Sequence, residues 1–342
     1  AAILAAAPAA AQEVRTASLE TGQDLSALSI EELAQLPVRS ASKVEEPLSR
    51  APTALFVLTG ADIEASAADS LPEALRLAPN LQVQQVDARQ YAITARGFNS
   101  VETSNKLLVL IDGRTVYSPL ASSVFWELHN RPLEEIAQIE IVSGPGGTLY
   151  GPNAVNGIVN ILTHDARDTI GGLVRATVGG EERSVAARYG APVGGDGAVR
   201  GYVTAFERED LPAGLGPDLD DGLRGWQAGF RADFGAGATH FTLQGDVFST
   251  DVSADPALAG DGDSGHNLLA RITHRPDDDS EFRVQAYYDR FEREFLLTRD
   301  ALATFDVEAQ YNRTAGAHAL VFGAGVRTTR DEFINNLNIF QL

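Results

Sequence analysis

From Asp168 onward, apolar and polar residues alternate along the chain, and this feature constrains the fold more than any other. In the stretch WQAGFRADF, every second residue from Trp226 to Phe234 is aromatic or alanine, and the residues between them are polar, charged or glycine. The stretches FRVQAYYD (282–289) and FDVEAQYN (305–312) follow a similar rule. Because successive side chains of a β-strand point to opposite faces, this half of the chain is predicted to form a sheet with one apolar and one polar face.

About nine such segments of roughly 7–11 residues follow one another, close to the length that a tilted strand needs to cross a bilayer. The connections between them alternate in length. Short connections lie at 191–198, 235–238, 275–280 and 314–317, and long ones at 207–224, 250–266 and 292–303. Short turns at one edge and long loops at the other are typical of an outer-membrane barrel. A soluble β-sandwich, the alternative, has no reason to keep its long loops at one edge.

In a membrane barrel the apolar face of each strand contacts lipid and the polar face lines the interior. Outer-membrane lipid is therefore an expected contact of these strands. The alternation assigns Trp226, Phe230, Phe234, Phe305, Val307 and Tyr311 to the lipid face, and Arg231, Asp233, Asp306 and Glu308 to the interior face.

Composition excludes several other classes of protein. A formal net charge of -20 argues against binding of nucleic acid, which requires cations to neutralise phosphate. The chain has no cysteine, which excludes disulfides and thiolate chemistry. Residues 1–11 are small and apolar and are interpreted as the remnant of a signal peptide, and residues 12–50 as a polar N-terminal extension. No later stretch has the 18 or more apolar residues of a membrane helix.

Between residues 51 and 165 the pattern changes to mixed helix and strand, which predicts a compact α+β domain. Strands are expected at 53–59, 81–86, 91–98 and 107–111. A helix is expected at 70–79, with Ser70 and Glu73 as a capping box. Asp112 and Gly113 lie between two apolar runs and predict a hairpin turn, and residues 132–142 are interpreted as a helix that enters a strand.

A glycine-rich turn opens the stretch SGPGGTLYGPNAVNGIVNILTH (143–164), an arrangement that can bind phosphate. A P-loop ends in Gly-Lys-Ser/Thr, but here Gly147 is followed by Thr148 and Leu149. A dinucleotide fingerprint opens a helix, but here an apolar strand is expected next. The stretch therefore predicts no nucleotide site, and its glycines indicate close backbone approach and positive φ angles.

No catalytic or metal-binding cluster stands out in the sequence. The six histidines are dispersed, and neither H-E-x-x-H nor G-x-S-x-G occurs. The stretch DGDSGH (261–266) lacks the third acid and the closing glutamate of a calcium loop, and is interpreted as a solvated loop tip. The sequence therefore predicts a protein that is not an enzyme and that has no cofactor or metal site. A soluble two-domain enzyme, the alternative of another class, would need a catalytic constellation.

Residues 36–163 resemble the plug domain of TonB-dependent outer-membrane receptors. The resemblance rests on APTALFVLTGADI, SLPEALRLAPNLQV, ITARGFNS, LLVLIDGRTVY and LEEIAQIEIVSGPGGTLYGPNAVNGIVNILT, which follow one another in the order found in the family. It implies a plug domain at 51–165, followed at 166–342 by the N-terminal portion of the outer-membrane β-barrel. The fold class expected is thus an α+β plug followed by antiparallel transmembrane strands.

The resemblance also implies contacts between plug and barrel. Arg96 and Gly97 match the family's Arg-Gly pair, and Glu140 matches the acid before its Gly-Pro. The family commonly has arginine before Gly-Pro, where this chain has Ser143, so a charge cluster that needs this arginine is not expected here. The candidate contact residues are Arg96, Gly97, Glu140, Gly144, Gly146, Gly147, Gly151 and Gly157.

Members of the family carry a Ton box, a short extended segment ahead of the plug that the inner-membrane protein TonB binds as an added β-strand. Backbone hydrogen bonds supply most of the affinity in such strand addition, so side-chain requirements are loose. By its position, the stretch LPVRSAS at 36–42 is the candidate, and a plain linker is the alternative. Its residues are Leu36, Pro37, Val38, Arg39, Ser40, Ala41 and Ser42.

The resemblance implies TonB-dependent active transport of a scarce external ligand across the outer membrane of a Gram-negative bacterium. A ferric siderophore is the first candidate for this ligand, with haem and cobalamin as the others. A receptor that binds ligand or signals without substantial transport is the alternative. Outer-membrane transporters with a plugged lumen use about 22 strands, and about nine cannot close around a plug, so the sheet is predicted to be an incomplete barrel that is open at its last strand.

Overall fold

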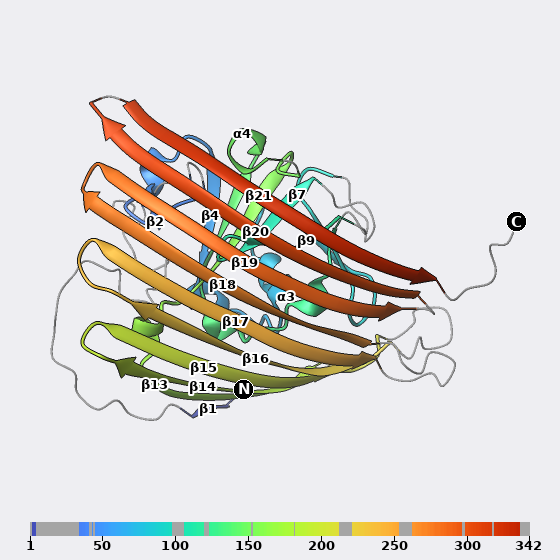
Figure 1. Ribbon diagram of the computed structural model, residues 1–342. Coiled ribbons are helices and arrows are strands. Elements are labelled where there is room, and N and C mark those ends of the chain that lie inside the picture. Colours follow the sequence, from blue (N-terminus) through green and yellow to red (C-terminus); the bar gives the residue numbers. More distant parts are fainter. Residues whose placement is uncertain are drawn as a thin grey trace, which may run out of the picture. The chain divides into compact units, whose positions relative to one another are not determined.

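The computed structural model describes residues 2–4, 34–40, 43, 45–97, 106–119, 123–151, 153–180, 182–211, 221–252, 262–295, 298–316 and 318–335. The chain divides into two compact units, Pro8–His164 and a second unit of Ala1–Ala7 with Asp165–Leu342 (Figure 1). None of the helices in the described ranges is long and apolar enough to cross a membrane.

The unit Pro8–His164 is built on a five-stranded sheet with the order β4-β11-β12-β7-β8. These strands are β4 Ala54–Thr59, β11 Ile136–Ser143, β12 Gly157–Thr163, β7 Leu107–Ile111 and β8 Arg114–Thr115. Strands β12 and β7 run parallel, and the other neighbours run antiparallel. Two small hairpins accompany the sheet, β5 Gln82–Gln85 with β6 Tyr91–Thr94, and β9 Tyr117–Ser118 with β10 Ser123–Val124.

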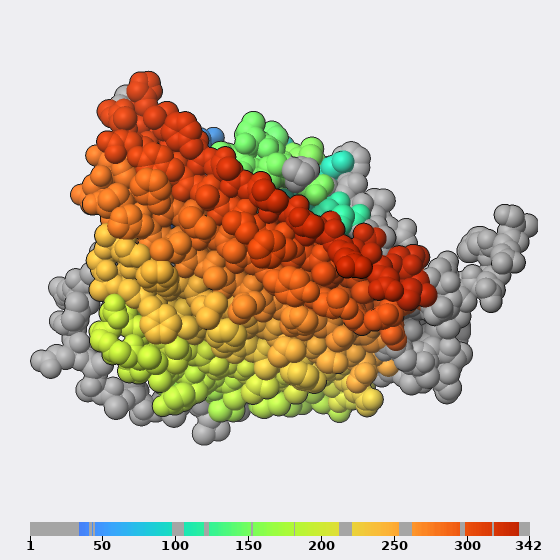
Figure 2. Space-filling view, viewed as in Figure 1, coloured from blue at the N-terminus to red at the C-terminus, as the bar shows by residue number. Residues whose placement is uncertain are grey.

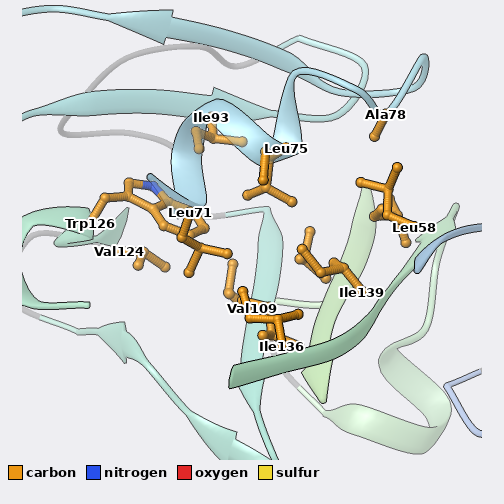
Figure 3. Packing of buried hydrophobic residues seen from close by; sticks show 14 of the residues in the cluster. Leu58, Leu71, Leu75, Ala78, Ile93, Val109, Val124, Trp126, Ile136 and Ile139 are labelled. Atoms are coloured by element: carbon orange, nitrogen blue, oxygen red, sulfur yellow. The ribbon is translucent and has the colours of Figure 1, made fainter. Parts of the chain in front are cut away.

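One face of this sheet carries the main hydrophobic core. Ile139 of β11 is fully buried, and it packs in the same cluster as Leu75 of helix α3 (Leu71–Leu75) and Ile93 of β6 (Figure 3). The opposite face is divided between a small apolar cluster around Ile158 and a polar group of buried side chains. That polar group comprises Glu140 and Asn160, which face each other across β11 and β12.

Local signals account for the turn after β7. Asp112 and Gly113 have φ angles of 50° and 83°, and Ile111 pairs with Arg114 beyond them. Positive φ at both central residues is the requirement of a type I′ hairpin, so the predicted turn is confirmed.

Two local predictions are wrong. Ser70 precedes α3 but makes no side-chain cap, and Glu73, its expected partner, instead forms an ion pair with Arg76 at 2.6 Å. The capping box of this unit belongs to helix α2 (Gly60–Ala65), whose cap is Thr59. The helix expected within 132–142 is only the short 3-10 turn Leu133–Glu135, because the β-branched run behind it already pairs in β11.

The second unit is an antiparallel sheet of ten strands in the order β1-β13-β14-β15-β16-β17-β18-β19-β20-β21. Figure 2 shows the surface of this sheet, coloured from yellow-green at β13 to red at β21. The strands are β1 Ala2–Leu4, β13 Gly171–Val178, β14 Glu182–Val193, β15 Gly197–Arg208, β16 Leu223–Phe234, β17 Thr239–Val252, β18 Gly262–Asp277, β19 Ser280–Phe295, β20 Thr298–Ala315 and β21 His318–Asn335. Strands β13–β21 are the nine expected segments. In the described ranges this sheet does not close on itself, and β1 and β21 are its two edges, as predicted.

The two faces of this sheet differ as the alternation predicts. On the apolar face Trp226, Phe230 and Phe305 are 44–53% exposed, whereas Asp233 and Asp306 on the polar face are buried. The apolar face also carries aromatic side chains stacked across neighbouring strands near the short turns. Phe282, Tyr311 and Phe322 form this stack, with ring centroids 4.3 and 6.4 Å apart.

Most of these strands are longer than expected, with 12–18 residues from β14 to β21. On β20 the apolar-face residues from Ala301 to Tyr311 span the length that lipid requires, and Arg299 and Arg313 lie just beyond them. The backbone ladder continues past this apolar stretch. Glu292 of β19 binds Arg299 at 2.6 Å, and pairing of the two strands reaches Phe295 and Thr298.

This extra pairing overturns two predictions about loops. The long connection expected at 292–303 is reduced to residues 296–297. Residues 262–266, expected at a loop tip, belong to β18, where Asp263 is buried and lies 3.8 Å from the Arg293 guanidinium. The connections 209–222 and 253–261 remain long, and both lie at the same edge of the sheet.

Glycine allows a hydrogen-bonded group on the polar face to span three strands. Gln227 of β16 donates to the Tyr202 hydroxyl at 2.7 Å, and Tyr202 of β15 donates to Asp246 of β17. Gly229 lies between them, and a Cβ there would lie 2.5 Å from the Tyr202 ring. The missing side chain is therefore what lets the ring reach across β16.

A short 3-10 helix at Ala166–Thr169 precedes the first long strand of the sheet. The Asp165 side chain accepts from the Arg167 N–H, and Asp233 of β16 accepts from the Ala166 N–H at 2.9 Å. Arg231 donates to the same Asp233 carboxylate at 2.7 Å. The beginning of this unit is therefore fixed by side chains of the unit itself.

Candidate partner-binding site

The segment Leu36–Ser40 lies against the polar group on the sheet of the first unit. Strand β2 (Pro37–Val38) pairs antiparallel with β3 (Glu46–Pro47), with Val38 opposite Glu46. Val38 and Ser40 are each 1% exposed, so the segment is a packed part of the fold. Ala41 and Ser42, the last two residues of the predicted segment, lie outside the described residues.

A buried carboxylate holds the end of this segment. Glu140 lies in the middle of β11 and is 0% exposed. Its two oxygens accept from the backbone N–H of Arg39 at 3.1 and 3.2 Å, and one of them accepts from the backbone N–H of Ser40 at 2.7 Å. Hydrogen bonds to a charged acceptor are stronger than neutral ones, and a buried carboxylate needs such donors to offset its desolvation.

Two neutral side chains complete the contact. Gln138, two residues before Glu140 on β11, donates through Nε2 to the Pro37 carbonyl at 3.3 Å and to Glu140 at 2.8 Å. Asn160 of β12 donates to the Ser40 hydroxyl at 2.9 Å. The three polar side chains of the sheet thus bind the segment mainly through its backbone.

Both edges of the segment are occupied. On one edge the Leu36 carbonyl accepts from the Leu48 N–H at 2.8 Å, and Val38 continues this ladder opposite Glu46. On the other edge the Pro37 carbonyl and the Arg39 N–H are bonded to side chains of β11. An extended backbone with both edges bonded offers no free ladder to a further strand.

The side chains at the rim of the segment contribute less. Arg39 pairs with Glu45 at 3.1 Å, and the Glu45 side chain is 54% exposed. The Lys43 ammonium lies 5.0 Å from the centre of the Tyr150 ring. Exposed ion pairs of this kind contribute little to stability, so the buried backbone contacts dominate.

The glycine-rich stretch serves packing within the unit. A Cβ at Gly157 would lie 2.7 Å from the Val142 carbonyl oxygen, and one at Gly146 would lie 2.5 Å from the Ile158 side chain. Gly144 and Gly151 have φ angles of 111° and 77°, which disfavour other residues. Gly147 begins helix α4 (Gly147–Tyr150). This helix has only four residues, so the turn does not resemble a phosphate loop, which opens a longer helix.

The remaining predicted contact residues lie at the end of β6. Arg96 is exposed and adopts a φ of 60°, and Gly97 has a φ of 94°. Thr94 donates to the Gly97 carbonyl and closes this turn. A contact of Arg96, Gly97, Glu140 or the glycines with the barrel concerns both units and stays a prediction.

Gln138 and Asn160 were not among the predicted site residues. Both are polar residues within strands that are otherwise apolar, IAQIEIV and GIVNILT. A buried polar side chain in such a strand needs a hydrogen-bond partner. Polar residues within these apolar strands were therefore the sequence signal for the site. Among the residues that the structure describes, no group of three or more acidic or histidine side chains could hold a metal ion.

Comparison with known proteins supports the expected plug domain. Residues 47–158 match the family model described as the TonB-dependent Receptor Plug Domain. The chain is 28% identical over 197 residues to the "Vitamin B12 transporter BtuB" of Vibrio vulnificus, covering 57% of the chain and 30% of that protein. It is 34% identical over 128 residues to the protein of the same name from Photobacterium profundum, covering 37% of the chain and 20% of that protein.

Solved structures share the fold at low identity. The open form of the ferric-catecholate import receptor Fiu from E. coli K12 has a TM-score of 0.64 at 18% identity, covering 84% of this chain and 50% of that one. The FpvAI–pyocin S2 complex has a TM-score of 0.69 at 12% identity, covering 87% and 46%. The chain spans about a third of the length of the first curated relatives it matches.

Proposed function

The chain belongs to the TonB-dependent outer-membrane receptors of Gram-negative bacteria, and from this premise we propose that the protein actively imports a scarce external ligand across the outer membrane. The observation that carries the proposal is the extended Leu36–Ser40 segment, which is held through its backbone ahead of the plug sheet. We propose this segment, with Ala41 and Ser42, as the Ton box.

Active import requires energy from elsewhere, because binding alone cannot move a ligand against its gradient. The glycine-rich stretch that could have suggested a nucleotide site is used for packing around Val142 and Ile158. TonB, which transmits energy from the inner membrane, is the partner that we propose. Strand addition to Leu36–Ser42 would give it a direct grip on the plug.

For the ligand we propose a ferric siderophore, with cobalamin and haem as the competing classes. Relatives named as vitamin B12 transporters support cobalamin, and the receptors of similar fold include proteins named for ferric siderophores. Deleting the intact gene and measuring uptake of each labelled ligand separates these classes. If the deletion strain loses binding of the ligand at the cell surface but keeps energised uptake, the protein is instead a receptor that does not transport.

The coupling step is tested by Val38→Pro in the full-length receptor. Proline fixes φ near −65° and removes the Val38 N–H, which lies on the edge paired with Glu46 of β3, so the extended backbone that an added strand needs is disrupted. We expect ligand binding in the cold to stay close to normal and accumulation at growth temperature to be abolished.

Val38→Thr is the matched control, because it keeps the backbone N–H and the branched shape of the side chain. It should accumulate ligand at a rate close to that of the parent. Unchanged accumulation in Val38→Pro would identify Leu36–Ser42 as a plain linker and refute the coupling role.

A further inference from the structure

We propose that the side chains of Gln138 and Glu140 act as a surrogate strand, which occupies the edge of the Leu36–Ser40 segment where the strand of TonB would otherwise add. The inference rests on the proposed function and names the contact that keeps the segment closed. TonB can pair with this edge only after displacing them.

The surrogate strand offers the donor and the acceptor that a real neighbouring strand would offer. The Pro37 carbonyl and the Arg39 N–H are two residues apart, and so are Gln138 and Glu140 on one face of β11. Gln138 donates to the carbonyl and Glu140 accepts from the N–H, which is the alternation that a neighbouring backbone would supply.

The surrogate strand is also fixed in place. Gln138 and Glu140 are bonded to each other at 2.8 Å, and Glu140 has no exposed surface. Its carboxylate has a second backbone donor in the Ser40 N–H, which lies where the segment turns away from the ladder. Because the charge is buried, it loses its compensating donors when the segment leaves, and this favours return of the segment.

The opposite edge does not offer an easier route. There the segment pairs with β3, and the Leu48 N–H and the Leu36 carbonyl extend that ladder in the same direction. An added strand on this side would have to separate two parts of one backbone hairpin. The edge bonded only to two side chains is therefore the one that a partner can take over.

The test uses the full-length receptor and the purified periplasmic domain of TonB as the probe. In Glu140→Gln the charge is lost, and one of the two acceptor oxygens that serve the Arg39 N–H, the Ser40 N–H and the Gln138 amide is replaced by a donor. We expect the affinity for the TonB domain to rise at least tenfold, which corresponds to about 1.4 kcal/mol. Glu73→Gln is the matched control, since Glu73 lies in the same unit and pairs with Arg76 instead of with the segment.

A second readout follows the segment directly. Residues 1–342 contain no cysteine, so Val38→Cys introduces a thiol into this part of the receptor at a position that is 1% exposed. Its labelling should be slow in the parent and at least tenfold faster when Glu140→Gln is added. Labelling of Ala92→Cys, in the buried strand β6, reports whether the plug itself has opened.

Ser40→Pro tests the same contact from the segment side and leaves β11 intact. It removes the N–H that binds Glu140 at 2.7 Å and should also speed the labelling of Val38→Cys. If Glu140→Gln also speeds the labelling of Ala92→Cys, the plug core has opened in that variant. Ser40→Pro alone then tests whether the contact with Glu140 holds the segment. Unchanged labelling and unchanged TonB affinity in the variant that keeps the core closed would overturn the proposal.

The two levels of the proposal fail differently. If labelling rises but the TonB domain binds neither the parent nor the variants, Glu140 still holds the segment and the proposed coupling function is refuted. If the TonB domain binds parent and variants equally while labelling rises, the coupling function stands and the surrogate strand is refuted, because the freed edge is then not the one that TonB uses.

Discussion

Arginine in place of Phe230 tests the membrane placement of the strands most directly. Phe230 is 44% exposed on the apolar face of β16, midway between Trp226 and Phe234, the ends of the apolar run on this strand. Four residues at about 3.3 Å each, tilted by about 40°, place Phe230 roughly 10 Å from either end of the run along the membrane normal. Half the height of a lipid-facing apolar band is about 12 Å, so Phe230 lies near the bilayer midplane.

This depth sets the expected cost. An arginine on the lipid face costs about 2–4 kcal/mol at the midplane and about 0–1 kcal/mol near the interfaces. Phe234→Arg is the matched control, because it makes the same change on the same face of the same strand near the short turn. We expect the free energy of unfolding of Phe230→Arg to be lower than that of Phe234→Arg by about 2–3 kcal/mol.

The assay is denaturant unfolding of the full-length receptor in lipid vesicles. Arginine at Gln227 is not a neutral comparison, because Gln227 is buried on the polar face and donates to Tyr202. Equal stabilities for the two phenylalanine variants would refute the assignment of this face to lipid. Loss of the difference in a detergent micelle, where chain ends reach the surface easily, would support a depth effect.

Three further predictions concern packing and charge. Gly157→Ala should lower plug stability by about 1–3 kcal/mol, because its Cβ would lie 2.7 Å from the Val142 carbonyl oxygen; unchanged denaturant unfolding would contradict this. Gly229→Ala should likewise destabilise the sheet, because its Cβ would lie 2.5 Å from the Tyr202 ring, and an unchanged thermal midpoint would contradict it. Burial raises the pKa of the Asp87 carboxyl in the folded protein. The stability that the protonated carboxyl contributes is therefore present at low pH and is lost as pH rises through the folded pKa. Asp87→Asn should therefore have a higher free energy of unfolding than the parent at pH 7 and nearly the same one at low pH. An equal gain at both pH values would refute the raised pKa of Asp87.

The strand-rich half was predictable because its signal is local. Alternation with a period of two follows from the pleat, and it identifies the apolar face at Phe230 and Phe305 without knowledge of any neighbour. The turn at Asp112 and Gly113 is equally local, since positive φ at both positions selects these residue types. In these places a short window of sequence contains the whole physical cause.

The candidate site was predictable only in part, because its contacts join distant residues. Arg39 and Glu140 are 101 positions apart, and no local rule relates them. The buried polar residues of β11 and β12 signal that some partner exists, but not which backbone supplies it. The predicted strand lengths were too short for a related reason. The ion pair of Glu292 with Arg299 accompanies a ladder that continues beyond the residues whose apolar–polar alternation predicts a strand.

The cap at the beginning of the second unit has a consequence for how such proteins are assembled from parts. The Ala166 N–H is bonded by Asp233, and Arg167 donates to the Asp165 side chain and to the Asp196 and Gly235 carbonyls. None of these partners lies before Asp165, so the first turn of the sheet unit is a self-sufficient module boundary. Recombination between related genes at this junction would therefore leave the hydrogen bonds at the boundary intact, and it provides a natural point for exchanging one plug for another.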